Sequence, residues 1–204
     1  MDPKYEKIEG KICKLLIKLN TSLRGKTFNE SIHLEPIVNL VKFLSTAEAT
    51  YVRRKLLKNF DFTYSSMISE MEYHEGEQRN KLRSAIKTME RMILDFLNVS
   101  LSQEEPEYEF ISRLEGVRRD QSYKTEMIEV LNEIFLYTSN KQCISKKLAY
   151  SLFLINIDLI NESGYLTEPF KDWNEMLESK NTAFNYHLSF YEVIEEIFGH
   201  GVRL

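Results

Sequence analysis

Cysteine, glycine and proline are scarce in this chain. The 204 residues include two cysteines, Cys13 and Cys143, which are too few for a disulfide framework or a structural zinc site. Seven glycines and four prolines leave few positions for tight turns. We therefore expect long secondary-structure elements, held together by an ordinary apolar core.

Long apolar runs are also missing. The longest run, Leu148–Ile160, contains Asn156 and Asp158, and it falls short of the ~20 residues that a membrane-spanning helix needs. The first ten residues lack the apolar segment of a secretory signal. We therefore expect no transmembrane segment and an intracellular location, in the cytoplasm or the nucleus.

Sequence motifs for familiar chemistry are absent as well. The chain has no phosphate-binding loop of the form G-x-x-x-x-G-K-[ST], no H-E-x-x-H pair and no G-x-S-x-G nucleophile turn. These absences remove the usual reasons to propose an enzyme, although a catalytic site assembled from distant residues would carry no such motif. We expect no metal site and no cofactor.

The few reactive side chains have simpler interpretations. His187 stands among apolar residues of the last expected helix, which is typical of a core histidine. An unfamiliar helical active site around His187, Tyr186 or Tyr191 is the competing hypothesis. Cys143 is expected at a helix start, where the helix dipole lowers a thiol pKa, but no histidine partner is evident. The other three histidines, in charged or terminal segments, are His33, His74 and His200.

What the chain does contain is apolar side chains at helical spacing. From Tyr5 to Leu23 they recur every three or four residues, after Pro3 and before Gly25, which predicts a first helix. Further helices are expected to begin at Pro36, at a capping box formed by Ser45 and Glu48, at Asp61, at Pro106, at Asp120 or Ser122, near Ser139 or Asn140, near Pro169 and before Phe184. The helix from Asp61 either breaks at Gly76 or continues through it, and the helical period goes on from Leu82.

One of these expectations involves a choice between a helix and a strand. The run Leu148–Ile160 is apolar on nearly every side, and we interpret it as an internal helix and not as a strand, because of its length. Gly116 is expected to end the short helix that follows Pro106. The sequence thus predicts an all-α fold of about eight or nine helices, a compact helical bundle or a short α-solenoid, in one domain over residues 1–204.

Charge is the feature that rises above background. The formal net charge is −4, yet the first 26 residues hold seven Lys and Arg against three Asp and Glu. Lysines of the first helix repeat every three or four residues and form one basic ridge. A second ridge and a basic cluster follow later in the chain. The basic residues are Lys4, Lys7, Lys11, Lys14 and Lys18, then Arg79, Arg83, Lys87 and Arg91, and Arg53 with Arg54.

Three interpretations of these basic residues compete. They can be solvated helix faces, docking surfaces for an acidic protein or for a second copy of the chain, or phosphate contacts to nucleic acid or anionic lipid. Because the aromatic residues follow the core period and do not interleave with the basic ones, nucleic-acid binding is the minority interpretation. The leading hypothesis is a non-enzymatic protein-interaction module, such as a helical adaptor or a scaffold subunit of a complex.

Overall fold

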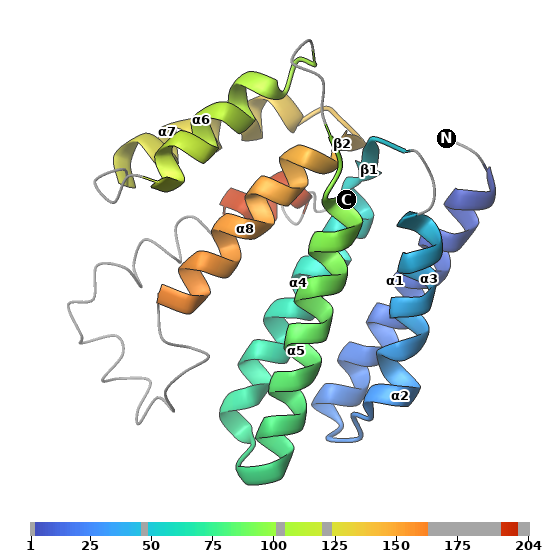
Figure 1. The fold of residues 1–204 in the computed structure, drawn as a ribbon. Helices are drawn as coiled ribbons and strands as arrows, with labels where there is room; N and C mark the ends of the chain where they lie inside the picture. Colours follow the sequence, from blue (N-terminus) through green and yellow to red (C-terminus); the bar gives the residue numbers. More distant parts are fainter. Residues whose placement is uncertain (1–2, 46–48, 101–104, 120–123, 163–192, 200–204) are drawn as a thin grey trace. The chain divides into compact units, whose positions relative to one another are not determined.

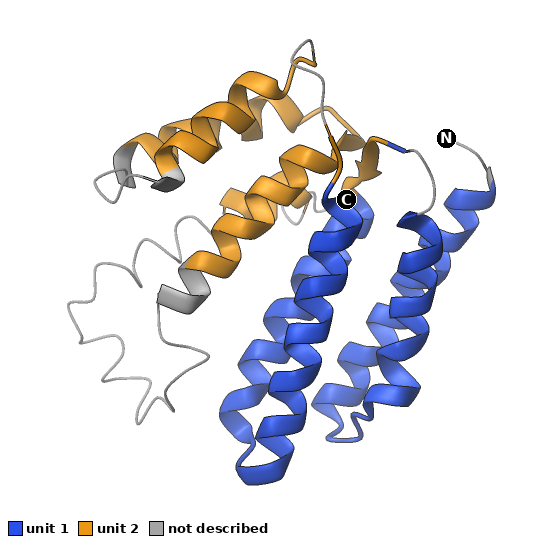
Figure 2. Ribbon diagram, viewed as in Figure 1, with its two compact units in different colours: residues 1–49, 55–98 blue, residues 50–54, 99–204 orange. Residues whose placement is uncertain are grey.

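The computed structural model describes residues 3–45, 49–100, 105–119, 124–162 and 193–199 (Figure 1). The predicted all-α fold is confirmed: a two-stranded sheet of three-residue strands is the one β element in these ranges. The chain divides into two compact units, residues 1–49 with 55–98 and residues 50–54 with 99–204 (Figure 2). Each unit is a helical bundle with its own core, and no helix of the described ranges could cross a membrane.

Unit 1 is built from two long helical hairpins. The helices are α1 (Pro3–Arg24), α2 (Glu30–His33), α3 (Glu35–Ser45), α4 (Arg54–Glu70), the 3-10 turn η1 (Met71–Tyr73) and α5 (Gly76–Leu97). The apolar residues predicted for the first helix face the core, and Ile12, Leu16 and Leu19 are fully buried. Gly76 opens α5 with φ of +56°, a left-handed conformation that favours glycine.

The four long helices of unit 1 form a closed ring. Helix α3 packs against both α1 and α5. Helix α4 closes the ring, since Asn20 of α1 donates to Thr63 at 3.0 Å and the rings of Phe60 and Phe96 meet edge to face. Helices α1 and α5 therefore stand at diagonal corners of the bundle (Figure 1).

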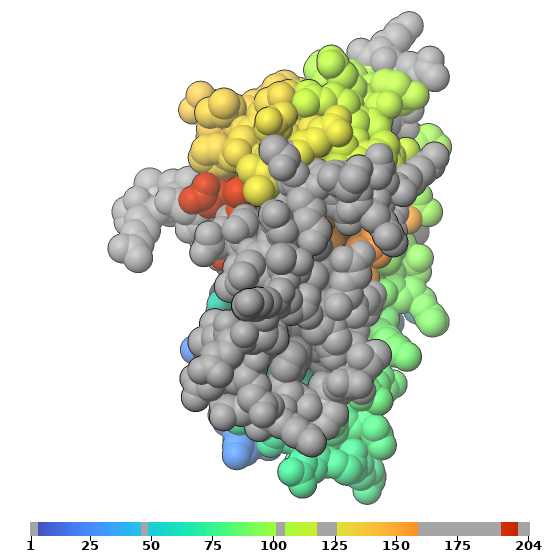
Figure 3. Space-filling model, turned by 90° about the vertical axis from the view of Figure 1, so that its left-hand side faces the viewer, coloured from blue at the N-terminus to red at the C-terminus, as the bar shows by residue number. Residues whose placement is uncertain are grey.

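In its described residues, unit 2 combines a small sheet with three helices and the short helical segment 193–198. Its elements are β1 (Tyr51–Arg53), α6 (Tyr108–Arg119), α7 (Lys124–Thr138), β2 (Cys143–Ser145), α8 (Lys146–Glu162) and the helical residues 193–198. Helix α6 packs on α8 and also on α7, which lies beside it in the space-filling view (Figure 3). Phe153 of α8 stacks on Phe198 with ring centroids 5.0 Å apart, which attaches residues 193–198 to the core.

Several predicted boundaries were wrong. Tyr51–Arg53 is a strand and not part of a helix, and the next helix runs unbroken through Asp61, which is completely buried inside it and is not its first cap. Helix α6 passes through Gly116 without ending. Helix α8 starts at Lys146 instead of near Ser139, so Cys143 lies in a strand and gains nothing from a helix dipole.

Other boundaries were right, and some cannot be compared. The helices predicted from Pro3 to Gly25, from Pro36 and over Leu148–Ile160 are present as α1, α3 and the body of α8. The remaining expectations lie outside the described residues: Tyr186, His187, Tyr191 and His200, the helix near Pro169, and the helix starts at Asp120 or Ser122 and before Phe184.

Candidate functional site

Two short strands of unit 2 pair with each other in a nearly symmetric way. β1 and β2 run antiparallel with Val52 opposite Ile144, and both side chains are fully buried. The backbone N–H of Arg54 donates to the carbonyl of Gln142 at 2.9 Å, and that of Lys146 donates to Thr50 at 2.8 Å. Each strand is therefore continued by a helix whose first residue is tied to the residue preceding the other strand.

The buried side chain of Arg54 connects the residues around the two strands. It is 8% exposed and donates to four backbone carbonyls, at 2.6 Å to Ile197, 2.8 Å to Glu196, 2.9 Å to Thr138 and 3.1 Å to Lys141. These carbonyls lie at the ends of α7 and of the helical residues 193–198, where helices leave acceptors unsatisfied and carry partial negative charge. Burial lowers the pKa of this guanidinium, and its role is to join two helix ends.

Glu107 and Tyr51 complete the polar contacts around the strands. The buried carboxylate of Glu107 accepts the backbone N–H of Ser145 at 2.9 Å. The Tyr51 hydroxyl donates to Glu105 at 2.8 Å, and this hydrogen bond, with burial and the neighbouring carboxylates, raises the pKa of Tyr51 to about 12. These contacts satisfy polar groups around the strands, and the raised pKa keeps the Tyr51 hydroxyl protonated at neutral pH.

Twice in the described chain, a short strand lies between two helices, and this order can be compared with calcium-binding helix–loop–helix motifs. α3, β1 and α4 form one copy, and α7, β2 and α8 form the other. Such loops bind calcium through six to eight oxygens, several from Asp and Glu. Residues 139–142 read Ser-Asn-Lys-Gln, and residues 46–50 include one carboxylate, Glu48. The loops therefore lack the anionic ligands that calcium requires.

Histidines give no metal site in the described part of the chain. Glu30 and His33 are three residues apart on α2, and His74 precedes α5. Within the described ranges, no group of three or more His, Cys, Asp or Glu side chains could hold a metal ion. Cys13 is buried in α1, away from solvent.

The predicted basic residues fall into three separate places. Lys4, Lys7, Lys11, Lys14 and Lys18 are all exposed along α1. On α5, Lys87 and Arg91 are exposed while Arg79 and Arg83 are partly buried. Because α1 and α5 are diagonal helices of one bundle, the two ridges lie on helices that are not neighbours. The side chain of Arg54 is buried, so Arg54 does not belong to the predicted basic surface. Its neighbour Arg53 is partly exposed on β1.

The outer face of α1 contains one residue that the charge pattern does not explain. Ile17 is 57% exposed and lies beside the lysine ridge, about 60° round the helix from Lys14 at ~100° per residue. The sequence signal for it is that Ile17 falls outside the apolar stripe of α1, on the basic side of the helix. Together Lys7, Lys11, Lys14, Ile17 and Lys18 form a surface about 16 Å long, at ~1.5 Å per residue, which we call the α1 patch.

The cations of the α1 patch have no acidic partner within the described part of the chain. Among the described residues, Lys7, Lys11, Lys14 and Lys18 make no ion pair. Lys4, at the N-terminal end, leans over the ring of Phe43 at 5.2 Å and so belongs to the α1–α3 contact. The α1 patch therefore offers four cations and one apolar side chain to another molecule.

Comparisons with protein-family models, with curated proteins and with solved structures found no match for this chain. Any statement about function therefore depends on the geometry of the chain itself.

Proposed function

We propose that this chain is a non-enzymatic protein-interaction module that binds an acidic surface of a partner protein through the α1 patch. The observation that carries the proposal is a ridge of four exposed lysines on one helix with the exposed Ile17 beside it. Apolar burial supplies contact energy, while the lysines steer an acidic partner and fix its register.

Nucleic-acid binding has less support. A duplex or a long single strand is held by many phosphate contacts at once, so a second basic surface next to the first would favour it. The ridges of α1 and α5 instead occupy diagonal corners of unit 1. The exposed isoleucine beside the lysine ridge of α1 also offers nothing to a phosphate backbone.

The test is a charge reversal with a matched control. Lys7→Glu combined with Lys11→Glu changes the α1 patch, and Lys87→Glu combined with Arg91→Glu makes the same charge change on the exposed face of α5. Each purified protein captures partners from native lysate, with and without nuclease, and the partners are identified by mass spectrometry. We expect acidic proteins that survive nuclease, that the α1 variant loses and that the α5 variant keeps.

Two outcomes would overturn the proposal. Equal capture by both variants would show that the α1 patch is not the binding surface. Partners that disappear with nuclease would assign the lysines to nucleic acid, and the affinity should then fall steeply with salt, by roughly 0.7 to 0.9 in logarithmic slope per phosphate contact.

A further inference from the structure

The lysines of the α1 patch have a spacing that one kind of partner matches. They are all exposed and follow one another at steps of four, three and four residues: Lys7, Lys11, Lys14 and Lys18. At ~1.5 Å of rise and ~100° of rotation per residue, the steps measure about 6, 4.5 and 6 Å along α1, and the four lysines fall within about 60° of its circumference. An acidic partner that pairs with every lysine must place its carboxylates at the same steps.

A helix meets this condition and an extended strand does not. A partner helix that lies along α1 has side chains on one face at steps of three and four residues, so it covers the same ~16 Å with the same intervals. In a strand, side chains on one face recur every second residue, about 6.6 to 6.8 Å apart, so three steps span about 20 Å. At the fourth lysine the strand is out of register by roughly 4 Å, which is longer than a hydrogen bond.

Beside the lysines, α1 has a strip against which a helix can pack closely. Gly10 and Ile17 lie on the same side of the lysine ridge, about 40° and 60° round from Lys14 at ~100° per residue. Gly10 is exposed, and a Cβ added there would meet no neighbouring atom of the described chain within 4 Å. The fold therefore does not require glycine at this position, although glycine weakens a helix relative to alanine. A residue without a side chain does allow the backbone of another helix to come near.

We infer that the partner element bound by the α1 patch is an acidic α-helix of at least about three turns, which lies along α1 with its backbone close to Gly10. Its carboxylates are three and four residues apart and pair with the lysines, and an apolar side chain beside them contacts Ile17. The inference rests on the proposed function, because it names the shape of the acidic partner.

Two designed peptides test the shape of the partner. Both are alanine-based, are about 18 residues long so that a helix can form, and contain the same number of glutamates and leucines. In the matched peptide the glutamates follow at steps of four, three and four residues, with the leucines on the adjoining face. In the alternating peptide the glutamates occupy every second position. Fluorescence anisotropy of each labelled peptide measures its affinity for the full chain at low and at physiological ionic strength.

The matched peptide should be the better ligand. We expect it to bind at least about tenfold more tightly than the alternating peptide, and we expect added salt to weaken the binding. In the protein with Lys7→Glu and Lys11→Glu, this preference should disappear, because half of the ridge then repels the glutamates.

A second comparison tests the close approach at Gly10. Gly10→Leu places a side chain in open space on a helix, where leucine is favoured over glycine, so the variant should melt at no lower temperature than wild type. It should nevertheless bind the matched peptide at least about tenfold more weakly, because the leucine holds the partner helix away. Gly116→Leu is the matched control, since Gly116 is also exposed inside a helix with open space beside it. This control should bind the peptide like wild type.

Three results would overturn the inference. They are no binding of either peptide, binding of the alternating peptide that is as tight as that of the matched one or tighter, and undiminished binding by a folded Gly10→Leu protein. Each of them leaves the proposed function standing if the Lys7→Glu, Lys11→Glu protein still loses acidic partners captured from lysate. Equal capture from lysate by the two charge-reversed proteins would remove both proposals.

Discussion

At the scale of single residues, Arg54 shows how far a charged side chain can differ from its appearance in a sequence. Two adjacent arginines suggested a basic surface, yet the side chain of Arg54 is buried and that of Arg53 is partly exposed. The difference arises because alternate residues at a strand end point to opposite sides. The sequence shows the pair of arginines, while the four carbonyls that surround one of them come from residues more than 80 positions away.

Replacing Arg54 should destabilise the chain more than any surface substitution. Arg54→Ala leaves carbonyls at two helix ends without donors, and we expect a loss of roughly 2–4 kcal/mol in the free energy of unfolding. Arg54→Lys should recover only part of it, because one ammonium cannot reproduce the planar arrangement of guanidinium donors. Denaturant unfolding of both variants gives the comparison.

The neighbouring Lys55 provides a matched control for this prediction. Its side chain is exposed at the start of the same helix, so Lys55→Ala should change stability by no more than about 0.5 kcal/mol. Equal losses for Arg54→Ala and Lys55→Ala would show that the buried hydrogen bonds contribute little.

At the scale of elements, one ion pair links α6 to α7. The guanidinium of Arg113 makes two hydrogen bonds to the carboxylate of Glu133, at 2.5 and 3.0 Å. This contact lowers the pKa of Glu133 below its ordinary 4.5. A depressed carboxylate pKa contributes stability above the unfolded-state pKa, and that contribution is lost as the pH falls through the folded-state value.

A double-mutant cycle of Arg113→Ala and Glu133→Ala should reveal this dependence. We expect a favourable coupling at neutral pH that shrinks as the pH falls below about 4.5 and that also weakens with salt, because both groups are accessible to solvent. Thermal melts at neutral and acidic pH measure it. A coupling that stays constant with pH would point to packing of the two side chains and not to their charges.

Calcium should leave the paired helix–loop–strand–helix segments unchanged. Ligands that bind only the folded state raise the melting temperature, but the loop before β2 contains no carboxylate, and the loop before β1 contains only Glu48. We expect equal melting temperatures in excess calcium and in excess chelator. An increase with calcium would mean that oxygen ligands from elsewhere in the chain complete a site.

Helices were easier to predict than strands, for a physical reason. The stripe from Tyr5 to Leu23 extends over most of the 22 residues of α1, so its period identifies the helix without any tertiary information. The strands have three residues each, too few for a period of two to be visible. They exist because Val52 and Ile144, far apart in the sequence, pair with each other, and that pairing is long-range information. Ser45 and Glu48 were interpreted as a helix start because their spacing is a local pattern, which carries no information about the long-range pairing of the next residues in a strand.

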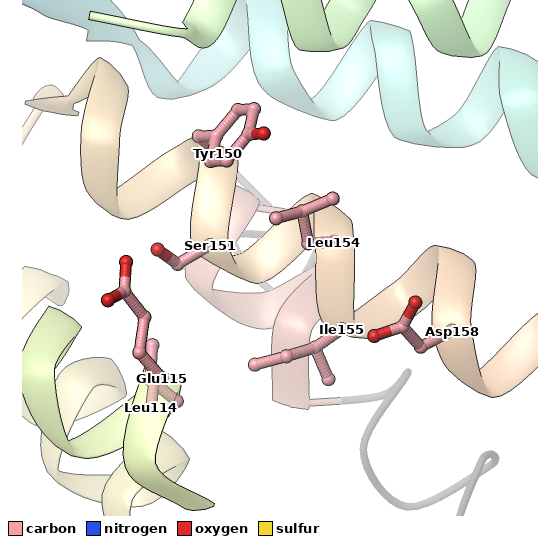
Figure 4. Close-up of a pocket in the computed structure, with 7 residues that line it drawn as sticks. All are labelled: Leu114, Glu115, Tyr150, Ser151, Leu154, Ile155 and Asp158. Carbon is pink, nitrogen blue, oxygen red and sulfur yellow. The ribbon is translucent and has the colours of Figure 1, made fainter. Parts of the chain in front are cut away.

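The candidate site was predictable in part for similar reasons. Lysine spacing alone placed Lys7, Lys11, Lys14 and Lys18 on one exposed face. Whether that face met the ridge of α5 depended on which helices of unit 1 are neighbours, which the sequence does not encode in any local pattern. The pocket between α6 and α8, lined by Leu114 and Leu154 among others, could not be predicted from the sequence either (Figure 4). Its residues belong to two helices and have no unusual spacing.

At the scale of the whole molecule, one segment of unit 2 lies between two segments of unit 1 in the sequence. Residues 50–54 belong to unit 2, although unit 1 lies on both sides of them along the chain (Figure 2). The strand β1 and the side chain of Arg54, which unit 2 needs, are therefore encoded inside the segment that forms unit 1. Cutting the chain at residue 98 leaves the helices of unit 1 on one fragment but removes β1 and Arg54 from unit 2.

Fragments should therefore behave unequally. Residues 1–98 contain the complete four-helix ring of unit 1, so we expect a cooperative thermal transition from this fragment alone. Residues 99–204 lack the partner of β2 and the donor that joins α7 to residues 193–198. Buried carbonyls and a strand edge without partners are costly, so this second fragment should melt at a lower temperature and without cooperativity.

A linked control protein, with residues 50–54 joined by a flexible Gly-Ser linker to residues 99–204, separates the causes. It restores Val52 opposite Ile144 and Arg54 beside the two helix ends, so it should recover a cooperative transition. The same protein with Arg54→Ala should lose most of that recovery, because strand pairing alone leaves the helix-end carbonyls unsatisfied. Cooperative folding of unmodified residues 99–204 would instead show that helix packing, and not the five borrowed residues, determines the stability of unit 2.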